Sequence, residues 1–98
     1  MQKKGYIYAE LTVTNPEAFY REYMPRVKPV LEKFGAVFLV ATDAPEVIEG
    51  DRVVPRIILI EFPSAEVARD FYNSPEYQEI IEYRFESSSA HLYILEGL

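Results

Sequence analysis

Cysteine and tryptophan are absent from this 98-residue chain, and histidine occurs once, as His91. Without cysteine the chain has no disulfide, no thiolate nucleophile and no sulfur ligand for a metal ion. A single histidine also excludes metal sites built from two or three histidines within one chain. No loop has the carboxylate spacing of a site for a hard cation. We therefore expect neither a bound metal ion nor another cofactor.

Basic residues are scarce as well. The chain has 10 lysines and arginines against 16 acidic residues, a net charge of -6, and its bases are dispersed. A phosphate backbone requires clustered cations, so nucleic-acid binding is not expected. An acidic surface disfavours anionic membranes, and no apolar run resembles a signal peptide or a membrane span. We expect a cytoplasmic protein with no membrane partner.

The length predicts a single domain over residues 1–98. Residues 5–13 alternate between apolar and amphipathic side chains, a pattern typical of a strand. Residues 16–34 then carry apolar side chains at helical spacing. The helix is predicted to begin after a cap at Asn15 and to end at Gly35.

Two prolines lie inside this predicted helix. Pro25 and Pro29 each remove a backbone donor and crowd the carbonyl four residues earlier. We therefore expect a kink or a break near Met24, which is either a harmless bend or one that widens a cleft beneath the helix.

The rest of the chain shows a similar alternation of elements. Its pattern predicts a strand over 36–41, a hairpin arm or ordered loop over 43–55, a central strand over 56–62, helical segments after caps at Ser64 and Ser74, a polar connection over 87–89, and a last strand over 91–96.

This order predicts an α+β fold of the ferredoxin-like βαββαβ type, with two helices on one face of a four-stranded antiparallel sheet. The other face would be bare and apolar, more so than a monomer usually exposes. We expect it to carry at least some of Tyr6, Tyr8, Phe38, Ile58, Ile60, Phe62 and Tyr93. Two such faces would pair in a homodimer, a dimeric α/β barrel.

Three polar side chains stand out against apolar surroundings. Glu61 ends a strand of isoleucine and leucine, and Arg84 lies on the apolar stripe of the last helix. Arg84 would pair with Glu61 or, as the alternative, bind an anionic ligand. His91 is either a strand histidine held by a neighbour or a general base or single metal ligand.

Tyrosine is abundant, with eight residues. The helices are expected to contribute four of them, Tyr20, Tyr23, Tyr72 and Tyr77, which suit either core packing or a pocket for a flat ligand. We predict a ligand cleft between the sheet and the helices, lined by Glu61, Tyr72, Tyr77, Arg84 and His91. Arg84 would neutralise an anionic group, and Glu61 or His91 would move a proton if chemistry occurs there.

Several short motifs together resemble domain-of-unknown-function family 1330, within the dimeric α+β barrel superfamily. They are Arg56, Glu61-Phe62-Pro63-Ser64, Ala68, Tyr72, Ser74-Pro75-Glu76-Tyr77-Gln78, Arg84 and Glu96-Gly97. The resemblance implies a ferredoxin-like subunit and a homodimer, and it implies no established reaction. The haem-degrading branch of the superfamily is disfavoured, because it relies on a helical histidine and typically on a tryptophan.

Three interpretations of function remain open at this point. The chain is a dimeric protein that binds a small aromatic or anionic metabolite, or a non-catalytic dimerisation and interaction module. The third is a cofactor-free monooxygenase or isomerase, by analogy within the superfamily alone. The residues do not decide whether it is an enzyme.

Overall fold

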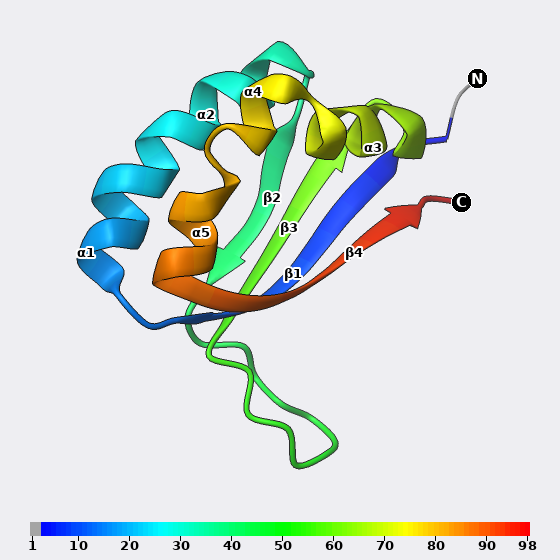
Figure 1. Cartoon of the computed structure of the whole chain (residues 1–98). Helices are drawn as coiled ribbons and strands as arrows, with labels where there is room; N and C mark the ends of the chain where they lie inside the picture. The colour runs from blue at the N-terminus through cyan, green and yellow to red at the C-terminus, as the bar shows by residue number, and fades with distance from the viewer. Residues whose placement is uncertain (1–2) are drawn as a thin grey trace.

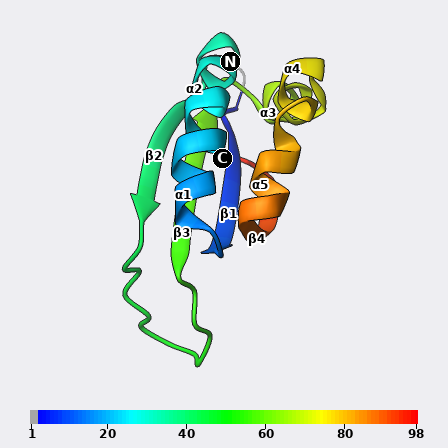
Figure 2. The ribbon, with the colours of Figure 1, turned by 60° about the vertical axis from the view of Figure 1, so that its left-hand side comes forward.

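The computed structural model describes residues 3–98 and contains one four-stranded antiparallel sheet in the order β2-β3-β1-β4. Its strands are β1 (Gly5–Val13), β2 (Val37–Thr42), β3 (Arg56–Phe62) and β4 (Ser88–Glu96). The helical segments are α1 (Pro16–Ala18), η1 (Phe19–Tyr23), α2 (Met24–Lys33), α3 (Ala65–Asn73), α4 (Pro75–Gln78) and α5 (Ile81–Ser87). They all cover the same face of the sheet (Figures 1 and 2), which confirms the predicted ferredoxin-like α+β fold. None of the helices within residues 3–98 has the length and apolar character needed to cross a membrane.

The alternation of β1 determines which side chains face the helices. Ile7, Ala9 and Leu11 are buried beneath them, whereas Tyr6 and Tyr8 point to the opposite face. Both neighbouring strands pair with β1 in antiparallel register. The same face assignment therefore extends across the sheet.

The predicted break near Met24 is a π-helical turn. In η1 the N–H of Met24 bonds to the carbonyl of Phe19, five residues earlier, and α2 starts at Met24. Pro25 therefore falls in the first turn of a new helix, where its missing N–H leaves no intrahelical bond unmade. Pro29 remains inside α2.

Serine side chains cap α3 and α4, the first two helices after β3, as predicted. The Ser64 hydroxyl accepts the N–H of Val67 at 3.1 Å, and the Ser74 hydroxyl accepts that of Tyr77 at 3.2 Å. These acceptors satisfy backbone donors that a helix start leaves without partners.

The polar connection expected over 87–89 is wrong, because α5 ends at Ser87 and β4 begins at Ser88. The Ser87 hydroxyl donates to the carbonyl of Tyr83 at 2.6 Å, and the Ser88 hydroxyl donates to that of Arg84 at 2.8 Å. Both serines are buried. Bonding back into the helix lets them form a tight junction where a loop was expected.

Residues 43–55 form an extended loop that projects from the end of the sheet where β2 leaves it (Figure 1). The hairpin alternative is not formed, since the loop contains no strand. Gly50 turns it at φ 96°, a conformation that favours glycine. An ion pair between Arg52 and Glu10 ties the loop to β1.

The face of the sheet away from the helices is open within this chain. It carries Val37, Val40, Tyr93 and Leu95, each at least 40% exposed. Tyr6, Tyr8 and Tyr93 lie there as expected. The other four residues considered for this face point to the helices instead, since they share the alternation of Ile7 and Ala9 across the register: Phe38, Ile58, Ile60 and Phe62.

Candidate functional site

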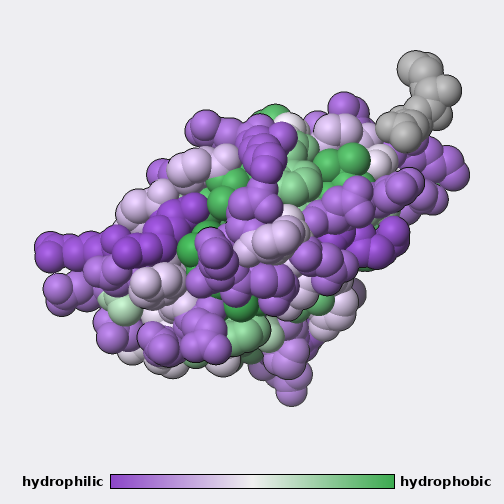
Figure 3. Space-filling view, turned by 45° about the horizontal axis from the view of Figure 1, so that its top comes forward, coloured by the Kyte–Doolittle hydropathy of each residue, from purple (hydrophilic) through white to green (hydrophobic). Residues whose placement is uncertain are grey.

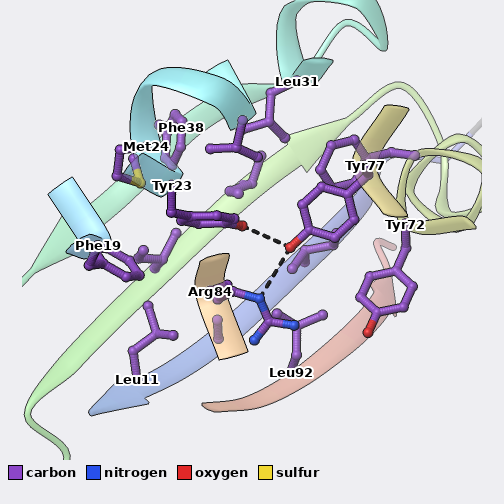
Figure 4. Close-up of a pocket in the computed structure, with 16 residues that line it drawn as sticks. Leu11, Phe19, Tyr23, Met24, Leu31, Phe38, Tyr72, Tyr77, Arg84 and Leu92 are labelled. Atoms are coloured by element: carbon purple, nitrogen blue, oxygen red, sulfur yellow. Dashed lines mark hydrogen bonds between the residues drawn. The ribbon is translucent and has the colours of Figure 1, made fainter. Parts of the chain in front are cut away.

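A cavity of about 50 Å³ lies between the sheet and the helices (Figure 4). Its lining is almost entirely apolar and comes from all four strands and from η1, α2, α3, α4 and α5: Ile7, Ala9, Leu11, Phe19, Tyr23, Met24, Val27, Leu31, Phe38, Ile58, Ile60, Phe71, Tyr72, Tyr77, Arg84 and Leu92. Apolar side chains also reach the surface between the hydrophilic outer faces of the helices (Figure 3).

Three polar groups meet at one part of this cavity. The hydroxyls of Tyr23 and Tyr77 are 2.8 Å apart, and the Arg84 Nε–H donates to the Tyr77 hydroxyl at 3.2 Å (Figure 4). The three side chains come from η1, α4 and α5, respectively. The same segments that form the helical layer thus bring the three groups together.

Counting protons shows what this corner offers to a ligand. Tyr23 and Tyr77 carry two hydroxyl protons, and either hydroxyl can donate the single bond between them. The remaining phenol proton has no acceptor among residues 3–98. Arginine supplies donors only. The corner is therefore rich in donors and lacks an acceptor for one of its hydroxyl protons.

Arg84 is a buried cation that has no carboxylate partner in the described part of the chain. Its residue exposure is 6%, and its hydrogen bond to Tyr77 is joined by a stacking contact with Phe85, 5.0 Å from the guanidinium carbon to the ring centroid. Burying a charge without a counter-charge is unfavourable. An anion in the cavity would supply the missing charge and accept the free donors.

Burial raises the pKa of Tyr23 well above its ordinary value of 10.0, and the neighbouring Tyr77 raises it further, while the nearby charge of Arg84 partly opposes both. Tyr23 therefore stays protonated at neutral pH and acts as a neutral hydroxyl. This makes it a hydrogen-bond donor rather than an anionic base.

The raised pKa of Tyr23 predicts a loss of stability at alkaline pH. Below pH 10 the tyrosine is protonated in both the folded and the unfolded chain. Above it the unfolded chain releases the proton first, so the free energy of unfolding falls by up to about 1.4 kcal/mol per pH unit. Chemical denaturation between neutral and alkaline pH should show a shallower decline in Tyr23→Phe than in the wild type. An equal decline of the free energy of unfolding in both proteins would contradict the raised pKa of Tyr23.

Tyr72 also lines the cavity, beside Tyr77. Its ring centroid lies 5.6 Å from that of Tyr77, and the residue is only partly buried. Of the five side chains predicted to line a cleft, the structure thus brings Tyr72, Tyr77 and Arg84 to one cavity.

The other two predicted residues, Glu61 and His91, lie on the open face of the sheet. Glu61 is the register partner of Tyr6, whose hydroxyl donates to it at 3.3 Å, and His91 is the partner of Glu10. The expected contact between Arg84 and Glu61 is therefore wrong, because the sheet separates the two side chains. Strand alternation places Glu61 and His91 on the open face, because each is adjacent in sequence to a strand residue that faces the helices.

A metal site is not formed by the described residues, since 3–98 contain no group of three histidine or acidic side chains close enough to bind an ion. The cavity itself is lined by neither a carboxylate nor an imidazole. What the arrangement can do chemically is bind and orient an acceptor, because tyrosine hydroxyls and a guanidinium are its polar groups.

Tyr23, considered among the helix tyrosines, is the site residue that the predicted cleft lining did not include. Its position at helical spacing between Phe19 and Val27 marks it as a residue facing the core. The signal that could have identified it is a hydroxyl on an otherwise apolar stripe, the same signal that selected Arg84.

Solved structures with the same fold include proteins of unknown and of known activity. The RPA0582 protein of Rhodopseudomonas palustris, of unknown function, is 18% identical, covers 100% of this chain and 85% of its own, and gives a TM-score of 0.78. SnoaB, a cofactor-independent oxygenase from Streptomyces nogalater, is 13% identical over 95% of this chain and 91% of its own, with a TM-score of 0.67. An EthD-like protein of Ralstonia eutropha is 14% identical over 98% and 93%, with a TM-score of 0.64. At these identities the likeness shows the fold alone.

The curated proteins contain no match to this chain. The family comparison agrees with the motifs and the fold described above. Residues 4–98 match the model of the domain of unknown function DUF1330, and the chain belongs to that family.

Proposed function

We propose that this protein is a homodimer that binds a small anionic ligand in the cavity of each subunit. The observation that carries the proposal is Arg84, a buried guanidinium beside a cavity and without a carboxylate partner in residues 3–98. The hydroxyl proton left over by Tyr23 and Tyr77 adds a second donor. A ligand that accepts hydrogen bonds and carries negative charge complements both groups.

Binding is favoured over acid–base catalysis by the same lining. The proton transfer considered for Glu61 or His91 requires one of them beside the ligand, and both lie across the sheet. A cofactor-free oxygenase is the second candidate, since SnoaB shares the fold. In that case the substrate would have to reach the cavity already ionised, because the lining contains no carboxylate or imidazole.

Titration with acetate tests the binding proposal. We expect acetate, added at constant ionic strength against chloride, to shift the NMR signals of Tyr23, Tyr77 and Arg84 in the wild type in a saturable way. Arg84→Met should abolish these shifts, whereas Arg69→Met, which removes an exposed charge, should leave them unchanged. Saturable shifts that persist in Arg84→Met would overturn the proposal, as would their absence in the wild type.

The open face of the sheet supports the homodimer. Val37 is 54% exposed and Tyr93 is 48% exposed in the isolated chain. The strand register places Val40, Leu59, Tyr8 and Tyr93 in one apolar row across this face. A second copy would cover the same row on both subunits through an isologous interface. A non-catalytic dimerisation module would use the same surface, and it would differ in leaving the cavity without a ligand.

Val40→Asp tests the interface. Val40 is 40% exposed in the isolated chain, so a carboxylate there should leave the subunit folded while opposing its burial against a second copy. We expect sedimentation to show a dimer for the wild type at micromolar concentration and a shift toward monomer for Val40→Asp. Asn73→Asp, which adds the same charge on the exposed side of α3, is the matched control. A wild-type mass equal to one chain would refute the dimer.

A further inference from the structure

The cavity is polar at one corner and apolar elsewhere. Beyond the corner formed by Tyr23, Tyr77 and Arg84, with Tyr72 beside it, every lining side chain is aliphatic, aromatic or the thioether of Met24. A ligand anchored at Arg84 therefore meets no hydrogen-bonding side chain along the rest of its length. Its shape must be that of an anionic head with an apolar tail.

We infer that the ligand class is a short, unsubstituted aliphatic monocarboxylate. This inference rests on the proposed anion binding and deepens it. The two carboxylate oxygens accept hydrogen bonds from Arg84 and from the free phenol proton, and the carbon chain lies among side chains such as Leu31 and Ile58. Because the corner carries a cation without a counter-charge among its lining residues, a neutral alcohol or a cationic amine is a poorer match than a carboxylate.

The volume of the cavity limits the tail. A cavity of roughly 150 Å³ in another protein holds one benzene molecule, which has six carbon atoms. The cavity here is about 50 Å³. A third of that volume corresponds to about two carbon atoms, so the two-carbon tail of propionate fills this apolar space when its carboxylate lies outside it, against Arg84. Longer chains or aromatic rings require the walls to move.

A second polar group on the tail would be penalised. A hydroxyl buried among these apolar side chains would lose its hydrogen bonds to water and find no replacement. Lactate, which differs from propionate by one hydroxyl, should therefore bind about tenfold more weakly. A second carboxylate should be excluded more strongly, since no further cation lines the cavity.

The test is a titration of the intact wild-type chain with formate, acetate, propionate, butyrate and hexanoate, followed by lactate, with dissociation constants from NMR shifts. We expect affinity to rise about fourfold with each methylene up to propionate, and to stop rising or fall with butyrate and hexanoate. A flat series, a steady rise through hexanoate, or lactate equal to propionate would overturn the inference. If acetate binds at Arg84 but affinity does not change with chain length, the proposed anion site is supported and the inference about the ligand class is refuted. If no acid binds, both the anion site and the inference are refuted.

Met24 provides a second, independent variant. It lines the cavity from the start of α2 and is only partly buried, so truncating it should enlarge the space with modest effect on folding. Met24→Ala should move the best-bound acid from propionate to butyrate or longer, while Met24→Leu, close in volume, should keep propionate. An unchanged optimum in Met24→Ala would place the tail elsewhere and contradict the inference.

Discussion

Replacing Gly5 with alanine is expected to lower the free energy of unfolding by about 3 kcal/mol or more. A Cβ atom at this position would lie 2.2 Å from the backbone nitrogen of Ala65 and 2.3 Å from the carbonyl carbon of Ser64. Both atoms belong to the capped start of α3, which packs directly on the first residue of β1. Backbone cannot rotate away as a side chain can, so the strand and the helix would have to separate.

Gly97→Ala is the matched control for this experiment. Its added Cβ would approach the Lys4 carbonyl and the Tyr6 ring at 3.1 Å, a contact that a small shift can relieve. We expect it to cost no more than about 1 kcal/mol. Urea denaturation at a fixed protomer concentration measures both variants, since the proposed dimer would make stability depend on concentration. A Gly5→Ala protein as stable as Gly97→Ala would show that α3 does not pack against β1 this closely.

The fold was predictable because its signals are local. The alternation in β1, the caps at Ser64 and Ser74 and the proline break before α2 each involve residues within a few positions of one another. Their order then restricts the topology to very few arrangements. The close approach of Gly5 to Ala65 was beyond such reasoning, since it depends on how two distant segments meet.

The candidate site was only partly predictable because β3 is apolar on both faces. A strand of uniform character gives no pattern from which to assign Glu61 to a face, and the register with β1 decides it. Helical spacing does show which side of a helix is buried, and Tyr72, Tyr77 and Arg84 line the cavity from that side. What spacing cannot show is that Arg84 has no carboxylate partner among residues 3–98, which depends on every side chain around it.

Because Arg84 has no carboxylate partner in residues 3–98, we expect Arg84→Met to stabilise the protein. Removing a buried charge from an ion pair usually destabilises a protein. Removing one member of a buried ion pair costs about 3–5 kcal/mol, because it leaves the other charge uncompensated. Arg84 has no such partner in residues 3–98, so its removal costs the hydrogen bond to Tyr77 and the contact with Phe85 but leaves no opposite charge uncompensated. We expect Arg84→Met to raise the free energy of unfolding by about 1–2 kcal/mol in a buffer without carboxylates, as the cost of burying the guanidinium disappears.

Thermal unfolding measures this effect and links it to function. For a domain of this size, each kcal/mol corresponds to roughly 4–8 °C in the melting temperature. Propionate should then stabilise the wild type and leave Arg84→Met unchanged, because a ligand stabilises only the state that binds it. Arg69→Met controls for net charge and should follow the wild type in both conditions. A destabilised Arg84→Met protein would mean that Arg84 has a structural role which outweighs the cost of its burial, and the unpaired cation would no longer support a ligand site.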